Sequence, residues 1–265
     1  MGDLFLYNIK LLFSYLFLNI KRITEYKLDF IFNLLSVFIW VGTGLFNILI
    51  LFTNIKTFDG WNLFEVCLLY GMWSLTFAIY NVFGSGILDI ENNIISGTMD
   101  IMLIKPISPL FQIIVSKINT MGLGFLSFGI VIIVISSIRL DIEWNIFKIC
   151  YLIFMVLVGG GLIFATYLIL ASLSFWFLKS NSAIKIGYDI HKFSQYPLSI
   201  YGKGIKIILS FILPYAFTNY YPIAFLLGKV NTIYGLISPL VCILGIIISI
   251  YIWKLGLKNY EGCGS

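Results

Sequence analysis

Charged residues are scarce in this sequence. Only 11% of its 265 residues are Asp, Glu, Lys or Arg, whereas 60% are hydrophobic. Soluble domains carry about 25% charged residues, and a chain with so few charges has too little polar surface to cover an apolar core in water. We therefore infer an all-α integral membrane protein whose apolar helices are covered by lipid.

Residue types that carry catalysis or bind metals are also few. The chain has a single histidine, His191, which we expect to be solvated in a lysine-flanked loop. The four cysteines lack CxxC spacing and are typical of small core residues. The sequence holds no HExxH, GxSxG or GxxxxGK[ST] motif, so we expect no enzyme active site, no metal site and no cofactor on this chain. The net charge of +5 comes without an arginine-rich aromatic patch, so nucleic acid is not an expected partner.

Six apolar stretches are long enough to cross a bilayer, which takes about 20 helical residues. They cover residues 28–52, 63–83, 110–138 and 149–178, a fifth within 205–227, and 233–255. No linker rich in Pro, Gly or Ser divides them, so residues 1–265 are expected to form a single domain.

The fifth stretch is interrupted by two prolines. Pro214 and Pro222 flank the polar residues 218–221, and proline removes a backbone donor and kinks a helix. We favour a span that ends near Tyr215 and is followed by a short segment dipping back into the membrane. A single kinked span is the alternative.

Residues 4–27 mix an apolar face with polar residues, and their unbroken apolar core is too short to span a bilayer. They predict a helix lying in the membrane interface, with a polar-interrupted first span as the alternative. Six spans place both termini on one side, and most of the 17 lysines and arginines fall on that side. The positive-inside rule then places both termini in the cytoplasm. We expect the protein in the plasma membrane. The excess of lysine over arginine hints at a bacterial source.

The segment after the second span reads GSGILDIENNIISGTMDIMLIKPISPL. It carries acidic residues, the turn-forming Gly97, Lys105, and two prolines ahead of the third span. This pattern predicts a short, partly amphipathic helix parallel to the membrane, followed by a rigid turn. Such a helix could transmit movement of a soluble partner to the membrane spans. An ordinary interfacial loop is an equally open interpretation.

Four stretches of this chain resemble one known family. The sequence SGTMDIMLIKPISPL, with Gly97, Asp100, Lys105, Pro106 and Pro109, resembles the signature of the ABC type-2 permease family. The stretches FSQYPLSIY and LPYAFTNYYPIAFLLG and the ending WKLGLKNYEGCGS resemble the same family. Together they run from about residue 84 to the C-terminus.

The resemblance implies a membrane subunit of an exporter. Two permease subunits would pair, as a homodimer or a heterodimer, and each would dock on a separate nucleotide-binding subunit that holds ATP and Mg. The segment between spans two and three would then be a coupling helix. The expected residues for contact with the ATPase are Asp89, Glu91, Asn92, Gly97, Asp100 and Lys105.

Two other functions stay open on the residues alone. An ion-coupled secondary transporter would need a deep acid or histidine, and the spans hold almost none. A non-transporting membrane scaffold is the other alternative. The few charges and many aromatics suit an amphipathic or hydrophobic cargo, with Tyr80, Asn81, Phe217 and Tyr220 as candidate path residues, although a packing role for these four is weighed equally.

Overall fold

The computed structural model describes residues 27–177 and 179–260, so the predicted interfacial helix at 4–27 lies almost wholly outside the described part. The regular elements of the described residues are helices, with one isolated bridge between Phe58 and Trp61. Five helices are long and apolar enough to cross a membrane, and up to seven spans result if two bent helix pairs each count as one. The expected all-α membrane class is confirmed.

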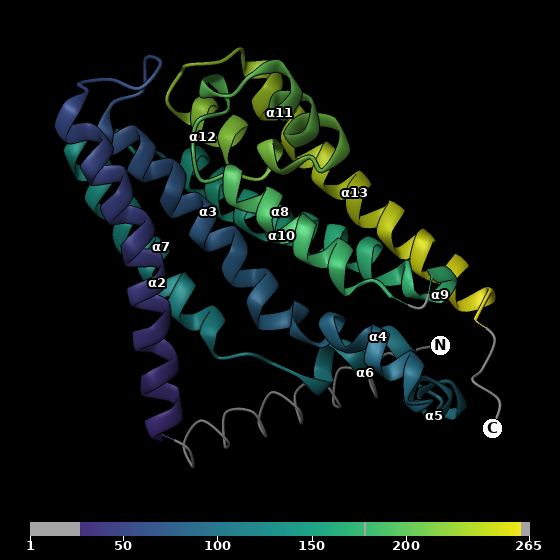
Figure 1. Ribbon diagram of the computed structural model, residues 1–265. Coiled ribbons are helices and arrows are strands. Elements are labelled where there is room, and N and C mark those ends of the chain that lie inside the picture. Colours follow the sequence, from purple (N-terminus) through teal and green to yellow (C-terminus); the bar gives the residue numbers. More distant parts are fainter. Residues whose placement is uncertain (1–26, 178, 261–265) are drawn as a thin grey trace.

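Five elements form the long helices of the bundle in Figure 1. They are α2 (Lys27–Asn54), α3 (Leu63–Gly84), α7 (Met121–Arg139), α8 (Ile146–Ser172) and α13 (Thr232–Lys258). The bounds of α2, α3, α8 and α13 match the expected first, second, fourth and sixth spans to within a few residues. In Figure 1, α2 begins and α13 ends on the side of the bundle that holds α4–α6.

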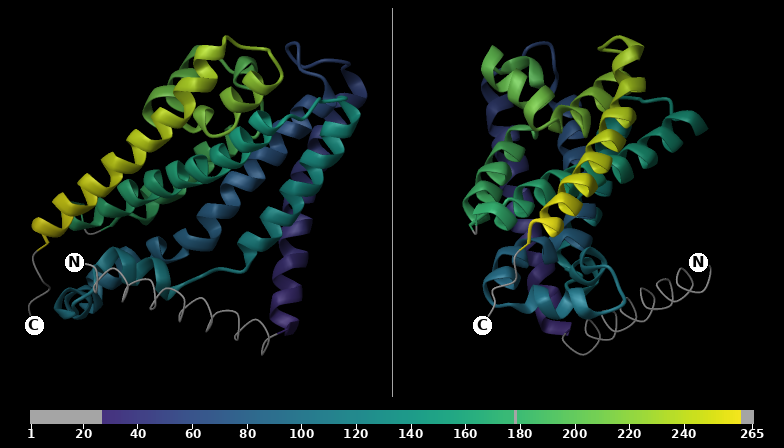
Figure 2. Two further views of the ribbon diagram at one scale, coloured as in Figure 1. Left: turned by 180° about the vertical axis from the view of Figure 1, so that it is seen from behind. Right: turned by 90° about the vertical axis from the view of Figure 1, so that its right-hand side faces the viewer.

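Shorter helices connect these long ones. They are η1 (Ser85–Asp89), α4 (Ile90–Ile95), α5 (Thr98–Ile104), α6 (Pro109–Ser116), α9 (Ser174–Phe177), α10 (Asn181–Phe193), η2 (Leu198–Ile200), α11 (Lys203–Ile207), the π-helix η3 (Ile208–Ile212), η4 (Tyr215–Phe217) and α12 (Tyr220–Leu226). Figure 2 shows α4, α5 and α6 at one end of the bundle and α11 and α12 at the opposite end.

Helix α3 is the centre of the bundle, and most of its residues from Val66 to Ala78 are buried. It packs against α7 through two glycines. A Cβ atom added to Gly129 would lie 3.0 Å from the carbonyl oxygen of Gly71, and a Cβ atom on Gly71 would lie 3.3 Å from that of Gly129. Small residues allow membrane helices to approach this closely because no side chain separates the backbones.

The expected third span is divided. Ser108 caps α6 through its hydroxyl, Pro109 occupies the first helical position, and the chain leaves the helix at Lys117 in an extended conformation. Proline is favoured at the start of a helix because that position needs no amide donor. Pro109 therefore begins a separate helix, and the long helix α7 begins at Met121 instead of near residue 110.

The expected fifth span, within residues 205–227, is not a continuous helix. The helical pair Lys203–Ile212 and Tyr215–Leu226 is bent by 74°, which confirms the interruption expected at Pro214. The hydroxyl of Tyr215 lies 3.1 Å from Oγ1 of Thr166, a buried residue of α8. In Figure 1, α11 and α12 both lie at the end where α13 begins, so this segment enters the interior and returns to the same end.

Helix α10 was not expected as a helix that packs beside the long apolar helices. Figures 1 and 2 show it beside α8, running from α9 toward the end that holds α11 and α12. Its buried residues are Ile184, Gly187 and His191, which share one face. Lys185 and Asp189 face outward. The helix is therefore amphipathic, although it lies among the apolar long helices.

His191 is fully buried, so the expectation of a solvated loop histidine is wrong. Its ring centroid lies 5.5 Å from that of Trp73, 5.0 Å from Phe77 and 4.8 Å from Tyr215. Neither ring nitrogen has a hydrogen-bond partner among the described residues. The loop prediction failed because the spacing of Ile184, Gly187 and His191 forms a helical face that packs inward.

Candidate functional site

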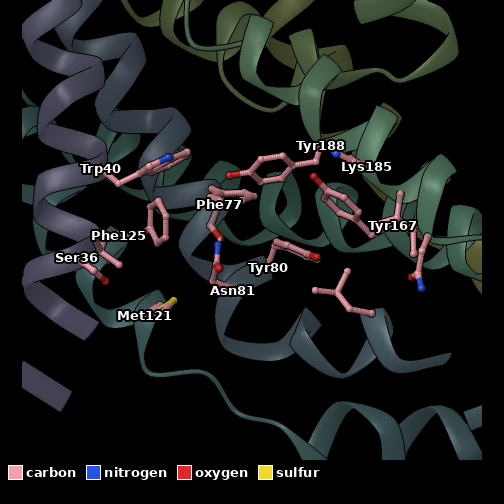
Figure 3. A pocket seen from close by; sticks show the side chains of 14 residues that line it. Ser36, Trp40, Phe77, Tyr80, Asn81, Met121, Phe125, Tyr167, Lys185 and Tyr188 are labelled. Carbon is pink, nitrogen blue, oxygen red and sulfur yellow. Dashed lines mark hydrogen bonds between the residues drawn. The ribbon is translucent and has the colours of Figure 1, made fainter. Parts of the chain in front are cut away.

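A cavity of about 650 Å³ lies between α2, α3, α7, α8 and α10 (Figure 3). Most of its lining is apolar or aromatic, and the aromatic side chains come from five different helices. The lining residues are Ser36, Val37, Trp40, Phe77, Tyr80, Asn81, Leu88, Met121, Phe125, Tyr167, Asn181, Ile184, Lys185 and Tyr188. Ligand sites in proteins are typically concave, mostly apolar and supplied with a few polar groups.

The inner wall of the cavity is a set of stacked aromatic rings. Tyr80 on α3 stacks on Tyr167 on α8 with 4.3 Å between ring centroids. Phe77 meets Phe125 on α7 edge to face at 5.1 Å. These geometries are favourable for aromatic pairs, and each ring has few rotatable bonds. The wall is therefore a rigid apolar surface that extends across three helices.

Polar groups stand mainly at the rim. Ser36 on α2 and Lys185 on α10 are exposed. Lys185 belongs to none of the ion pairs formed by the described residues. Deeper in, the side-chain amide of Asn81 donates to the carbonyl oxygen of Phe77 at 2.9 Å. The site thus combines an apolar interior with one cation and a few hydrogen-bonding groups at its edge, and it suits binding rather than covalent chemistry.

Two of the four candidate path residues line this cavity. Tyr80 and Asn81 do so, whereas Phe217 and Tyr220 lie elsewhere. Phe217 packs on Tyr221 at 4.6 Å, and Tyr220 packs on Trp61 at 5.6 Å. The contributions of α2 and α10 were missed, among them Trp40 and Tyr188. The signal for α10 was its amphipathic pattern, which the loop assignment overlooked.

The expected coupling segment is helical but divided into η1, α4 and α5. Gly97 separates α4 from α5 with φ of 69°, a left-handed conformation that favours glycine. The expected ATPase-contact residues fall into two groups. Asn92 and Lys105 are exposed, and Asp100 lies in the first turn of α5 and is partly exposed. Asp89 and Glu91 instead make contacts within the chain.

Asp89 and Glu91 connect the segment to two other parts of the bundle. The carboxylate of Asp89 forms an ion pair with Lys117, in the connection between α6 and α7. Oε2 of Glu91 accepts hydrogen bonds from the backbone amides of Ser180 and Asn181, at 2.6 and 2.7 Å, at the start of α10. The two acids thus join the segment to the connection that leads into α7 and to the start of α10, and both helices line the cavity.

Several large apolar side chains of the segment are exposed. Ile104 is 84% exposed, and Ile95, Ile101 and Leu103 are also on the surface. An exposed apolar group with polar residues around it is typical of a surface that meets another protein or the membrane. The segment therefore has the properties of a contact surface at the end of the bundle.

The described residues contain no group of three or more His, Cys, Asp or Glu side chains that could hold a metal ion. His191 is fully buried in the aromatic cluster, and its nitrogens lack hydrogen-bond partners within the described part of the chain.

These features define a multi-pass helical membrane protein with an aromatic cavity inside the bundle and a structured segment at one end. A family model described as ABC-2 family transporter protein matches residues 38–264. Because this match covers most of the sequence, the chain belongs to that family. A search of curated proteins finds no match. The chain is thus the permease subunit of an ABC transporter, a membrane component that works with an ATP-binding subunit and has no ATPase of its own.

Proposed function

We propose that this permease subunit exports an amphipathic or hydrophobic cargo, using ATP and Mg held by a separate nucleotide-binding subunit. The observation that carries this proposal is the cavity of about 650 Å³ with its aromatic wall. Flat apolar surfaces of this kind bind through contact area and desolvation and impose little hydrogen-bond selectivity. The few polar groups at the rim suit a cargo that has one polar end.

We propose that a second permease subunit contacts the exposed face of α10. Lys185 and Asp189 are exposed on α10, and Figure 1 shows α10 beside the long apolar helix α8. A charged side chain facing lipid near the bilayer centre costs about 2.5–3.5 kcal/mol. The exposed face of α10 is therefore better matched to water or to another protein than to lipid. A homodimer or heterodimer that encloses an aqueous path along α10 would meet this requirement.

The segment from η1 to α5 is proposed as the contact for the ATPase. Its exposed Ile101 and Ile104 supply apolar contact area, while Asn92, Asp100 and Lys105 supply polar contacts beside them. We infer that this end of the bundle faces the cytoplasm of a bacterial cell and that both termini lie on the same side. The positive-inside distribution of the lysines supports this orientation.

The cavity is tested by binding of a fluorescent hydrophobic probe, rhodamine 6G, to the purified complex of permease and ATPase. We expect Tyr80→Ala to weaken probe binding at least fivefold, because it removes the ring that stacks on Tyr167. Phe217→Ala is the matched control, since Phe217 is also a partly buried aromatic residue but lies outside the cavity. Equal effects of the two substitutions would show that the cavity is not the binding site.

The ATPase contact is tested by charge reversal. We expect Asp100→Lys to abolish probe-stimulated ATP hydrolysis and to weaken co-purification of the ATPase, while the chain still inserts into the membrane. Glu143→Lys is the control, because Glu143 is an exposed acid in the connection between α7 and α8, outside the segment. Undiminished co-purification and stimulation with Asp100→Lys would refute this assignment.

A further inference from the structure

The N-terminus of α10 is capped by a residue from a different part of the chain. Ser180 occupies the capping position, yet its hydroxyl makes no capping hydrogen bond. Oε2 of Glu91 instead accepts from the backbone amides of Ser180 and Asn181. Glu91 lies in the first turn of α4, 89 and 90 residues earlier in the sequence than these two donors.

This contact is stronger than an ordinary side-chain hydrogen bond. The first amides of a helix have no partner within the helix, and the positive end of the helix dipole attracts a carboxylate. Hydrogen bonds with a charged partner are roughly twice as strong as neutral ones. Ser180 is only 1% exposed, so water has little access to its amide. Losing the Glu91 carboxylate would leave these donors without their partner.

The rest of the segment is held against the same corner of the bundle. Ile90 and Ile94 are buried, and α4 packs against α8 and α9, the two helices that precede α10. The Glu91 carboxylate therefore belongs to a helix that packs against the two helices preceding α10. A shift of α4 cannot leave the first turn of α10 in place without breaking two charge-assisted hydrogen bonds.

The first two turns of α10 also form a wall of the cavity. Asn181, Ile184, Lys185 and Tyr188 line it, and all four lie within eight residues of the capped end. Glu91 thus connects the segment directly to the start of this wall. A matching connection on the other side runs from Asp89 to Lys117, and the chain from there leads to Met121 and α7.

We propose that Glu91 is a positioning residue that transmits movement of the η1–α5 segment to α10 and so changes the shape of the cavity. The inference rests on the proposed function, in which the ATPase moves this segment. Asp89 connects the segment to the chain ahead of α7 through its ion pair with Lys117. This pair is exposed to solvent, since 57% of the Lys117 side chain is accessible. Exposed pairs contribute little, so Glu91 provides the tighter of the two connections.

The experiment is hydrogen–deuterium exchange mass spectrometry on the permease–ATPase complex in nanodiscs, with and without ATP and vanadate. In the natural sequence, nucleotide should change amide exchange both in residues 85–104 and in residues 180–188. In Glu91→Ala, the change in 85–104 should persist, whereas the change in 180–188 should fall at least fivefold. Asp89→Asn is the matched control and should leave the response of 180–188 intact.

A second variant separates transmission from simple stabilisation of α10. Ser182→Asp places a carboxylate in the exposed first turn of the helix, which offsets the loss of the distant cap. In Glu91→Ala/Ser182→Asp, exchange of α10 without nucleotide should return toward its natural level, but the nucleotide response of 180–188 should stay absent. A full nucleotide response in this double variant would overturn the role of Glu91.

The outcome also distinguishes this inference from the proposed function. If residues 85–104 of the natural sequence do not respond to nucleotide, the ATPase contact is wrong and the role of Glu91 falls with it. If 85–104 respond and 180–188 respond equally in Glu91→Ala, only the role of Glu91 is overturned. Should Glu91→Ala yield too little complex, Glu91→Gln with Ser182→Asp gives the same comparison, because the amide lacks the charge.

Discussion

The contact between α3 and α7 yields the sharpest stability prediction. A methyl group on Gly129 would lie 3.0 Å from the backbone oxygen of Gly71 and 2.7 Å from a side-chain carbon of Leu75. The leucine can rotate away, but the carbonyl oxygen belongs to the helix backbone. Gly129→Ala therefore requires the two helices to separate by a few tenths of an ångström along their shared face.

The size of the effect follows from the cost of overpacking. Inserting a methyl group into a close-packed interior typically costs about 1–3 kcal/mol, and 1.4 kcal/mol is about a tenfold change in the folding equilibrium constant. Gly42→Ala is the matched control, because a Cβ atom on Gly42 in α2 meets nothing within 4 Å. That substitution should be neutral or stabilise the helix by up to about 1 kcal/mol.

The assay is thermal unfolding of the purified complex in detergent, followed by the fraction that stays monodisperse after heating. The two variants should differ by about 1–4 kcal/mol, and each kcal/mol corresponds to about 2–4 °C in midpoint for a chain of this size. Gly129→Ala should have the lower midpoint. Equal midpoints for both variants would refute the close approach of the α3 and α7 backbones.

Three further outcomes are expected. Lys229→Met should lower stability by about 1 kcal/mol in the same thermal assay, because it removes the ion-pair partner, at 2.8 Å, of the Glu65 carboxylate, whose side chain is 13% exposed. An unchanged midpoint in low salt would contradict this. His191→Phe should fold and retain probe-stimulated ATP hydrolysis, because His191 stacks on the rings of Trp73 and Phe77 and forms no hydrogen bond with the described residues. Loss of transport with normal folding would instead indicate a proton-linked role. Gly97→Val should lower ATPase co-purification, because its φ of 69° strains a branched side chain in the turn between α4 and α5.

The site was predicted only in part. Tyr80 and Asn81 were expected on the cargo path, and both line the cavity. The continuous apolar run of the second span predicted the helix that carries them, and this helix is α3. Phe217 and Tyr220 were grouped with them, but they sit on a segment that bends back at Pro214. Sequence spacing carries no information about where such a bent segment points.

The sequence by itself determined the class of this protein and the position of most long helices. Long apolar runs specify membrane helices because the bilayer requires about 20 apolar residues per crossing, and Gly97 specified the turn in the η1–α5 segment because it needs a positive φ. Tertiary structure alone decided the burial of His191, the position of α10 beside α8 and the contact from Glu91 to Ser180. These depend on residues about 90 or more positions apart meeting in space, and no local pattern of apolar residues encodes that meeting.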